Sequence, residues 1–342
     1  MAAAGCEKQP FVDRPGFLSM KVFRGMPAVA SPQRTAVAIG NFDGVHLGHQ
    51  VLLNDVRERA RALGPEGLSA ALTFEPHPRE FFCKESTPAR ITTLRDKARL
   101  IARCGIDRLY FAHFDEKLAS LSPEDFVREI LVARLRAAYV SVGGNFTFGR
   151  FGEGKACDLV RLGREAGIEV HAAPLLASGE ACISSSRIRR LLAEGRLAEA
   201  ERLMGHAFTI TGRVLHGAQL GRTIGFPTLN VRPLPPGCKA RPALEGVFTV
   251  RIEGLEPARA LYGVCSMGNR PTVGQGLAYT CETNVFDWKG DAYGRMIRIE
   301  FLEKLRGNKK FQNLAELQAA IAEDARRARD TVAALQAARD PE

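Results

Sequence analysis

The chain has 342 residues, of which 45% are apolar and 25% are charged. This length predicts two domains, and the composition is typical of folded globular proteins and excludes a disordered chain. Lys and Arg total 48 against 38 Asp and Glu, giving a net charge of +10 that favours anionic partners such as phosphates or nucleic acid. No apolar run is long enough to span a membrane, and residues 1–10 lack a signal-peptide core, so we expect a cytoplasmic protein with no membrane partner.

Cysteine and aromatic content narrow the class further. The eight cysteines show neither a C-x-x-C motif nor a zinc-finger spacing, and we expect them to be reduced. Aromatic residues make up 7%, and no RNP-like motif or basic low-complexity stretch is present. A basic RNA-binding module is therefore a disfavoured hypothesis, and we expect no nucleic-acid partner. The sequence also gives no sign of a protein partner.

The first half alternates strands with helices. Residues 1–19 are unpatterned and are predicted to be an N-terminal extension, with Met20 as a candidate start. The predicted strands are 36–40, 69–74, 108–111, 139–142 and 168–172. The predicted helices are 48–63, one ending at Gly105, one opened by Ser122 and Pro123, and 156–166. This alternation predicts a doubly wound parallel sheet over residues 20–186.

The second half is predicted to be mostly β. Helices 187–194 and 197–204 form a predicted connector over residues 187–205, after which the hydrophobic period changes from 3.6 to 2. Strands at 208–215, 247–252, 258–266, 279–286 and 296–302 predict a small antiparallel barrel or sandwich within residues 206–342. A C-terminal helix follows, with Asn313 and Glu316 as a capping box and an apolar stripe of Leu314, Leu317, Ile321, Val332 and Leu335.

The most informative segment of the first half is Gly-Asn-Phe-Asp-Gly-Val-His-Leu-Gly-His at residues 40–49. It joins a strand to a helix, and ligands of open α/β sheets lie at the carboxyl ends of strands, beside helix N-termini that attract anions. His46 and His49 can donate hydrogen bonds to phosphate oxygens, and Gly44 and Gly48 allow close approach of the backbone. The segment predicts a phosphate site.

Three further segments of the first half are weaker signals. Residues 73–78 and 143–149 follow two other strands at the same expected edge, but each is as typical of packing as of ligand binding. Residues 183–189, Ile-Ser-Ser-Ser-Arg-Ile-Arg, place hydroxyls at a helix start before an arginine. That pattern predicts a second anion site, suited to a departing pyrophosphate, with a plain serine N-cap as the alternative.

In the β half, residues 217–230 combine glycines with Thr228 and Asn230. Glycines let backbone N–H groups approach an anion, and the two oxygen-bearing side chains on one face of an extended segment suit Mg²⁺. The alternative is that the glycines are barrel corners. Glu282 lies in an alternating segment, where a carboxylate can accept a proton from a substrate hydroxyl, although most strand glutamates are merely solvated.

Together these segments resemble the bacterial bifunctional riboflavin kinase/FAD synthetase family. The resemblance extends from about Met20 to the C-terminus, and its motifs occur in the family's order: GNFDGVHLGH (40–49), TFEPHP (73–78), GGNFTFG (143–149), ISSSRIR (183–189), GRTIGFPTLN (221–230), GVCSMGNRPT (263–272) and ETNVFDWKGDAYG (282–294). It implies an FMN adenylyltransferase domain over residues 20–186 and, over residues 206–342, a riboflavin kinase domain built as a six-stranded Greek-key barrel.

The resemblance implies two reactions that use ATP with Mg²⁺. In the kinase, Glu282 would accept the proton of the ribityl hydroxyl, and Thr228 and Asn230 would hold Mg²⁺. The ATP phosphates would lie against a glycine-rich set, which comprises Gly217, Gly221, Arg222 and Gly225. The family usually has an acid where this chain has Asn308.

In the adenylyltransferase, the FMN phosphate would attack the α-phosphorus of ATP, FAD would form and pyrophosphate would leave, so no protein nucleophile is required. The implied catalytic residues are His46, His49 and Arg189. The implied ATP-binding residues are Gly40, Phe42, Asp43, Gly44, Ser185 and Ser186, and the implied flavin-binding residues are Phe74, His77 and Asn145.

A second enzymatic hypothesis is a nucleotidylyltransferase for another small phosphorylated metabolite, with a β domain that is not catalytic. The serine, arginine and histidine motifs of the first half are compatible with it. The oxygen ligands and carboxylate of the β half argue against it.

Overall fold

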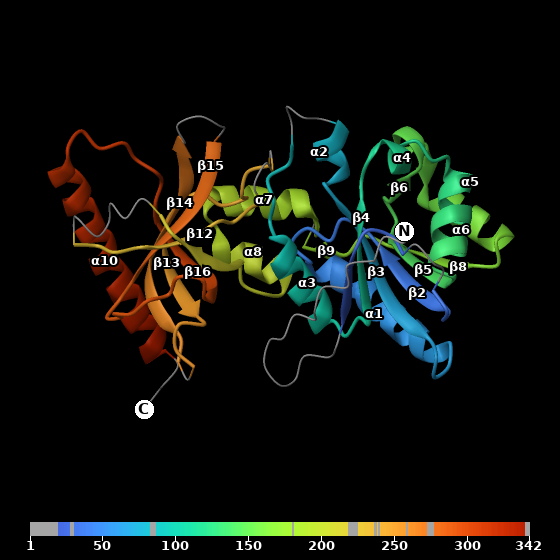
Figure 1. Ribbon diagram of the computed structural model, residues 1–342, viewed down its shortest axis with the longest axis horizontal. Helices are drawn as coiled ribbons and strands as arrows, with labels where there is room; N and C mark the ends of the chain where they lie inside the picture. The colour runs from blue at the N-terminus through green and yellow to red at the C-terminus, as the bar shows by residue number, and fades with distance from the viewer. Residues whose placement is uncertain are drawn as a thin grey trace, which may run out of the picture. The chain divides into compact units, whose positions relative to one another are not determined.

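The computed structural model describes residues 20–27, 31–82, 87–179, 181–217, 225–235, 238, 240–257, 259–271 and 277–338. The chain forms two compact units: unit 1 comprises residues 1–86 and 97–183, and unit 2 comprises residues 87–96 and 184–342 (Figure 1). These units differ from the predicted domains at residues 87–96 and 184–186, and the domain boundaries stay a prediction. The predicted extension, residues 1–19, lies outside the described residues.

Unit 1 is built on a six-stranded parallel sheet in the order β1-β4-β3-β2-β5-β8. Its strands are β1 (Lys21–Arg24), β2 (Thr35–Ile39), β3 (Leu68–Glu75), β4 (Arg108–His113), β5 (Ala137–Gly143) and β8 (Glu169–Ala173). The central strands are almost wholly buried because helices cover both faces, which explains their continuous apolar runs. The predicted parallel α/β architecture is confirmed.

In unit 1 the helices come between the strands along the chain. They are α1 (Leu47–Ala62), α2 (Pro78–Phe82), α4 (Glu116–Ala119), α5 (Pro123–Asp125), a π-helix (Phe126–Arg134) and α6 (Ala156–Glu165), while α3 (Leu94–Arg103) contains the boundary between the units. The Ser122 hydroxyl accepts from the Asp125 N–H at 3.0 Å, as the predicted N-cap requires. The π-helix and α6 share one core cluster with the sheet, whereas α1 packs on β2, β3 and β5 with Leu52, Leu53 and Val56.

Small elements complete unit 1. A hairpin of β6 (Thr147–Phe148) and β7 (Gly154–Lys155) encloses a single 3₁₀ turn, Arg150–Gly152, and a second hairpin joins β9 (Ala177–Ser178) to β10 (Ala181–Cys182). None of these two-residue strands was expected from the sequence, because such short segments carry no hydrophobic period.

The strand order of unit 1 locates a ligand crevice. The chain runs from β2 to β3 and then β4 on one side, and β5 returns to the other side of β2. The direction of winding therefore reverses between β2 and β5. Open α/β sheets bind ligands at such a switch point, outside the carboxyl ends of the strands. The loops that begin at Gly40 and Gly143 leave the sheet at this point.

Unit 2 contains a closed antiparallel barrel in the order β11-β12-β15-β14-β13-β16. Its strands are β11 (Thr209–Leu215), β12 (Leu229–Val231), β13 (Gly246–Glu253), β14 (Leu261–Pro271), β15 (Leu277–Val285) and β16 (Met296–Arg306), and helices α7 (Ser185–Glu194) and α8 (Leu197–Met204) precede them. The predicted barrel is confirmed. The sixth strand, β12, was expected only as an extended segment.

The C-terminal helix α10 (Leu314–Ala337) packs on the barrel differently from the prediction. The Asn313 N-cap is confirmed, since Asn313 Oδ1 accepts from the Glu316 N–H at 2.9 Å, while the Glu316 carboxylate accepts from the Gln312 N–H at 3.2 Å. The predicted apolar stripe is wrong at both ends, because Leu314 is 57% and Leu335 40% exposed. The buried residues are Asp324, Ala328 and Val332, of which only Val332 was predicted. Arg306 neutralises the buried Asp324 carboxylate at 2.7 Å, which lets a charged residue lie among them.

The six described cysteines, at positions 104, 157, 182, 238, 265 and 281, are free thiols, and Cys6 and Cys83 lie outside the described residues. No helix among the described residues is long and apolar enough to cross a membrane.

Candidate functional site

The loop after β2 is sharply folded. Phe42 and Val45 have φ angles of 46° and 38°, in the left-handed region that side chains rarely adopt, and Gly44 has a φ of 86°. The Phe42 ring is completely buried, and it lies 3.4 Å from the point a Cβ on Gly40 would occupy. Asp43 and Gly44 are also buried. The loop is therefore a fixed structure that leads directly into α1, as an anion cradle requires.

The two predicted histidines form a stacked pair at the start of α1. Their ring centroids lie 3.6 Å apart at an interplanar angle of 17°. His46 is the N-cap, and its Nδ1 accepts from the His49 N–H at 3.3 Å. Because Nδ1 is an acceptor, the neutral His46 ring carries its proton on Nε2, which makes that atom a donor. A Cβ on Gly48 would lie 3.3 Å from the His46 ring, so glycine leaves room for the stack.

Lys97 supports this loop from within the fold. Its side chain is 1% exposed, and Nζ donates to the Asn41 carbonyl at 2.8 Å. The Thr73 hydroxyl donates to the same carbonyl at 3.0 Å. The sequence interpretation missed this residue. The sequence feature that could have revealed it is its spacing, because Lys97 lies three and four positions before the buried Leu100 and Ile101 and so shares their apolar helix face.

The three predicted flavin-binding residues differ in exposure. Phe74 is 8% exposed and meets Phe114 edge to face at 5.8 Å. His77 is also buried, and its Nδ1 accepts from the Arg79 N–H at 3.1 Å. Asn145 is exposed in the turn that follows β5. All three follow or end strands at the carboxyl edge, and their roles toward a flavin stay predictions.

The serine and arginine segment opens α7. Ser184 is the N-cap, and its hydroxyl accepts from the Arg187 N–H at 3.3 Å, so Ser185 and Ser186 are the first helical residues. Arg189 Nε donates to the Ala89 carbonyl at 2.6 Å. These residues belong to unit 2, whereas His46 and His49 belong to unit 1. That the two groups act in one adenylyl-transfer site stays a prediction.

The barrel brings its predicted residues together through strand register. Asn230 on β12 stands opposite Glu282 on β15, and Glu282 stands opposite Ser266 on β14. Paired residues share a face of the sheet, so these three side chains form a row across three strands. Cys281 and Thr283, which alternate with Glu282, are fully buried and point inward. Glu282 itself is half-buried.

Two contacts fix the segment that precedes β12. Asn284 Nδ2 donates to the Pro227 carbonyl at 2.8 Å, which holds the residue next to Thr228 against β15. Asn230 Nδ2 is 3.4 Å from the Thr228 carbonyl. A Cβ on Gly217 would lie 2.4 Å from that same Nδ2, so the glycine backbone lies directly against the Asn230 amide. Gly225 is exposed with a φ of 83°, and Gly221 and Arg222 lie outside the described residues.

The donor set of this row fits magnesium. The described residues contain no cluster of three or more His, Cys, Asp or Glu side chains that could hold a metal ion. Asn230 stands opposite Glu282, and Thr228 lies two residues before Asn230. The hydroxyl and amide oxygens are hard donors, and Mg²⁺ is commonly held by few protein oxygens together with substrate phosphates. A side chain at position 217 would displace the Asn230 amide, so glycine there keeps this proposed ligand in its place.

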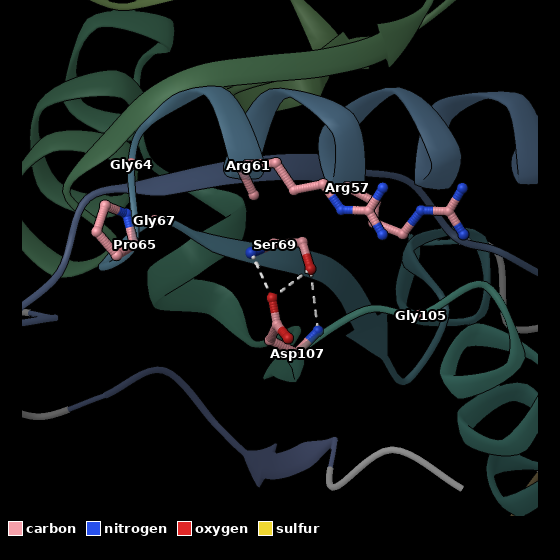
Figure 2. Close-up of a pocket in the computed structure, with 9 residues that line it drawn as sticks. Arg57, Arg61, Gly64, Pro65, Gly67, Ser69, Gly105 and Asp107 are labelled. Atoms are coloured by element: carbon pink, nitrogen blue, oxygen red, sulfur yellow. Dashed lines mark hydrogen bonds between the residues drawn. The ribbon is translucent and has the colours of Figure 1, made fainter. Parts of the chain in front are cut away.

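A cavity of about 570 Å³ lies elsewhere in unit 1, at the amino ends of β3 and β4 (Figure 2). Figure 2 shows the Asp107 carboxylate accepting from the Ser69 N–H and hydroxyl, at 2.9 and 2.7 Å. Arg57, also in the lining, donates to the Cys104 carbonyl at 3.2 Å. These groups join neighbouring elements of the sheet edge opposite the predicted site, and no predicted site residue lines the cavity.

Comparison with known proteins assigns both halves of the chain. A family model described as FAD synthetase matches residues 28–187, and one described as riboflavin kinase matches residues 204–332. The chain is 40% identical over 313 residues to the bifunctional riboflavin kinase/FMN adenylyltransferase of Escherichia coli strain K12, covering 91% of this chain and 97% of the relative. The chain belongs to the bifunctional riboflavin kinase/FMN adenylyltransferase family.

Further relatives agree with this membership. The bifunctional riboflavin kinase/FMN adenylyltransferase of Haemophilus influenzae is 37% identical over 306 residues, covering 89% of this chain and 97% of the relative. A crystal structure described as a macrolide-efflux protein from Streptococcus pneumoniae superposes with a TM-score of 0.70 at 28% identity, covering 89% of this chain and 98% of that one. The hypothesis of a β domain that is not catalytic is not favoured, because the riboflavin kinase model matches that half.

Proposed function

We propose that this chain makes FMN from riboflavin at the barrel residues around Glu282 and FAD from FMN at a separate site that includes the loop of residues 40–49, with ATP as the second substrate of each reaction. It is then a transferase with two activities, riboflavin kinase and FMN adenylyltransferase. The observation that carries the proposal is that two different family models match successive parts of one chain, residues 28–187 and 204–332. Its substrates are small molecules, and we propose that it works in the cytoplasm without a nucleic-acid partner.

In the kinase reaction, the 5′-hydroxyl of riboflavin attacks the γ-phosphorus of ATP and ADP leaves. Glu282 accepts the proton that the hydroxyl loses, because a carboxylate positioned against a nucleophile is a general base. The register that sets Asn230 beside Glu282 supports this role, since it brings phosphate-binding and proton-accepting groups to one face of the barrel. Gly217, with Gly221, Arg222 and Gly225, lies along the phosphates.

Magnesium would be held by Thr228 and Asn230 in this proposal. When bound, Mg²⁺ neutralises the phosphate charge that grows as phosphoryl transfer proceeds. The Thr228 and Asn230 side chains orient the triphosphate. Asn284 keeps Thr228 in place by donating to the Pro227 carbonyl.

In the adenylyltransferase reaction, an oxygen of the FMN phosphate attacks the α-phosphorus of ATP and pyrophosphate leaves. The nucleophile comes from the substrate, so the protein contributes orientation and charge stabilisation. His46 and His49 donate hydrogen bonds to ATP phosphate oxygens beside the loop of Gly40, Phe42, Asp43 and Gly44, which leads into the α1 N-terminus. Ser185, Ser186 and Arg189 stabilise the departing pyrophosphate. Asn145, Phe74 and His77 line the flavin end.

A product assay tests the function. The full chain is incubated with riboflavin, ATP and Mg²⁺, and FMN and FAD are resolved by chromatography. We expect both products, with FMN appearing first. FMN without FAD would contradict the adenylyltransferase assignment, and the absence of both would overturn the proposal. RNA affinity that falls steeply with salt, in a chain making neither flavin, would favour the RNA-binding hypothesis.

Two substitutions separate the sites. Glu282→Ala should lower FMN formation by about 10²-fold or more, the usual contribution of a general base, and leave FAD formation from supplied FMN intact. His49→Ala should do the reverse. If either substitution stopped both reactions in a folded protein, the assignment of a separate site to each reaction would be wrong.

A further inference from the structure

The β15–β16 loop (residues 286–295) follows the strand that carries Glu282. Its far end is attached to the end of β11. The Gly294 N–H donates to the Val214 carbonyl at 2.9 Å. The Tyr293 ring stacks on His216, with centroids 3.8 Å apart and an interplanar angle of 21°. His216 immediately precedes Gly217, whose backbone lies against Asn230. The loop therefore connects β15, the strand of the proposed base Glu282, to Gly217 at the start of the proposed phosphate-binding segment (residues 217–230).

The near end of this loop is attached to α10 by one side chain. Arg329 Nη1 and Nη2 donate to the two carboxylate oxygens of Asp287 at 2.8 and 3.0 Å. The same guanidinium lies over the Phe286 ring, 4.3 Å from its centroid. The hydrogen bond from Arg329 holds the pKa of Asp287 below its ordinary value, so the pair is charged at neutral pH. A forked pair of this kind fixes orientation as well as distance.

The backbone at Asp287 needs such a constraint. Asp287 has a φ of 53°, in the left-handed region that residues other than glycine seldom adopt. This residue turns the chain from β15 into the loop, only five positions after Glu282. The pair is exposed, with 52% of the Arg329 and 76% of the Asp287 side chain accessible, so it contributes little to global stability. Its effect is local, on the direction in which the loop leaves the strand.

We propose that Arg329 is a positioning residue of the kinase site, which sets the start of the β15–β16 loop through Asp287 and Phe286 and thereby positions Gly217, next to the loop's far end, and the Asn230 amide beside it relative to Glu282. This inference rests on the proposed function of unit 2. Arg329 touches no reacting atom in the proposal. It acts through the loop, whose other end is attached at Val214 and His216.

The same helix supplies a matched control. Arg326 lies one turn before Arg329 and forms ion pairs only within α10, with Glu323 at 2.7 Å and Asp330 at 3.0 Å, among the contacts of the described residues. Its side chain is 63% exposed, similar to that of Arg329. Arg326→Ala therefore removes the same kind of side chain from the same helix without touching the loop.

The test is steady-state kinetics on the full chain carrying Arg329→Ala, Asp287→Ala, both, or Arg326→Ala. Misplacing reacting groups by about 1 Å costs up to about 10²-fold in rate, so we expect kcat for FMN formation to fall about tenfold in either single variant. The KM values for riboflavin and ATP should stay within about threefold, because the lost interaction acts in the transition state. The double variant should be no slower than the single ones, since both remove one contact. The Arg326→Ala variant should have the same kcat for FMN formation as the unchanged chain. All of the variants should form FAD from supplied FMN at the rate of the unchanged chain.

The possible outcomes distinguish a failure of the positioning role from a failure of the proposed function. If the unchanged chain forms FMN and Arg329→Ala behaves as Arg326→Ala does, the positioning role is wrong while the proposed function stands. If the unchanged chain forms no FMN, the proposed function itself fails. If Arg329→Ala is unstable, Arg329→Lys and Asp287→Asn are used in its place, because they nearly keep the size of each side chain. Their kcat for FMN formation then tests the positioning role. A fall in kcat in those two variants supports the role, and unchanged kcat overturns it.

Discussion

The two proposed sites are built on different kinds of backbone. In unit 1 the proposed phosphate-binding groups lie on or next to a loop whose residues Phe42, Gly44 and Val45 adopt left-handed φ angles. In unit 2, Asn230 and Glu282 stand opposite each other on paired strands. A loop of this shape exists only while neighbouring side chains hold it, whereas a strand position is set by ladder hydrogen bonds on both sides.

This difference shows where each site is vulnerable. The loop of unit 1 depends on buried polar supports beneath it, chiefly the hydrogen bonds that Lys97 and Thr73 donate to the Asn41 carbonyl. The row of unit 2 depends on close backbone approach, because Gly217 leaves no room for a side chain beside Asn230. Removing a support should damage the first site, and adding a methyl group should damage the second.

The largest effect is expected from Lys97→Met. Methionine matches the shape of the buried side chain but donates no hydrogen bond, so the Asn41 carbonyl loses its charged partner and the loop above it can shift. We expect FAD formation from supplied FMN to fall by about 10²-fold, with FMN formation from riboflavin unchanged. Both rates are measured on the same preparation, by chromatography of the flavins.

Lys117→Met is the control for this substitution, because Lys117 is an exposed lysine in the same unit. It should leave both rates as they were. FAD formation by Lys97→Met within about twofold of the unchanged chain would mean that the loop needs no support from below, and the contrast between the two sites would be lost.

A tenfold effect is expected from Gly217→Ala. The added Cβ would lie 2.4 Å from Asn230 Nδ2, so the amide or the backbone must move. Overpacking costs typically about 1–3 kcal/mol, and we expect kcat/KM for FMN formation to fall by about tenfold while FAD formation persists. Gly307→Ala is the matched control in unit 2, since a Cβ there would meet nothing within 4 Å. Equal kinase activity in the two variants would show that Asn230 does not need its present position.

Sequence reasoning worked best where burial is continuous. The central strands of unit 1 carry apolar runs typical of a sheet covered on both faces, and the five predicted strands agree with β2, β3, β4, β5 and β8 to within a few residues. Strand β12 was recognised only as extended chain, because three residues are too few to show a period of two. Its pairing with β15 places Asn230 beside Glu282. The register between two segments that are distant in the sequence cannot be inferred from either segment alone.

Charged residues inside the fold were harder to predict. Asp324 was passed over in favour of leucines at both ends of α10, although its ion pair with Arg306 makes it the better buried residue. Lys97 was missed for the same reason, since a hydropathy pattern assigns every lysine to the surface while accepting oxygens, such as the Asn41 carbonyl and the Thr73 hydroxyl, can hold one inside. Arg329 could not be found at all, because its partner lies 42 positions away.

The smallest effect is expected from Asp55→Asn, which tests whether every polar anchor of α1 matters to the site. Asp55 Oδ2 accepts from the Tyr139 hydroxyl at 2.8 Å and lies 3.0 Å from His171 Nδ1, so it ties the third turn of α1 to β5 and β8. Burial by itself would raise the pKa of the Asp55 carboxyl, but hydrogen bonds, first that of His171, and the charge of His171 hold it below its ordinary value of 3.8. A carboxyl whose pKa is lowered by folding stabilises the native state fully above its unfolded pKa, and that contribution is lost as the pH falls through the folded pKa.

Asp55→Asn should therefore lower the free energy of unfolding by less than about 1 kcal/mol near neutral pH, since the carboxyl is partly exposed to solvent. The difference from the unchanged chain should shrink as the pH is lowered past the ordinary carboxyl pKa of 3.8 and through the lower pKa of the folded state, because the Asp55 side chain loses its charge there. Urea unfolding at neutral pH and at a series of acidic pH values measures it, and Glu165→Gln, which removes half of an exposed ion pair with Arg161, is the control. FAD formation should be unaffected by Asp55→Asn, because the anchor lies away from the loop of residues 40–49. Loss of FAD formation would mean that the whole of α1, and not only the carbonyl held by Lys97, sets the geometry of the phosphate site.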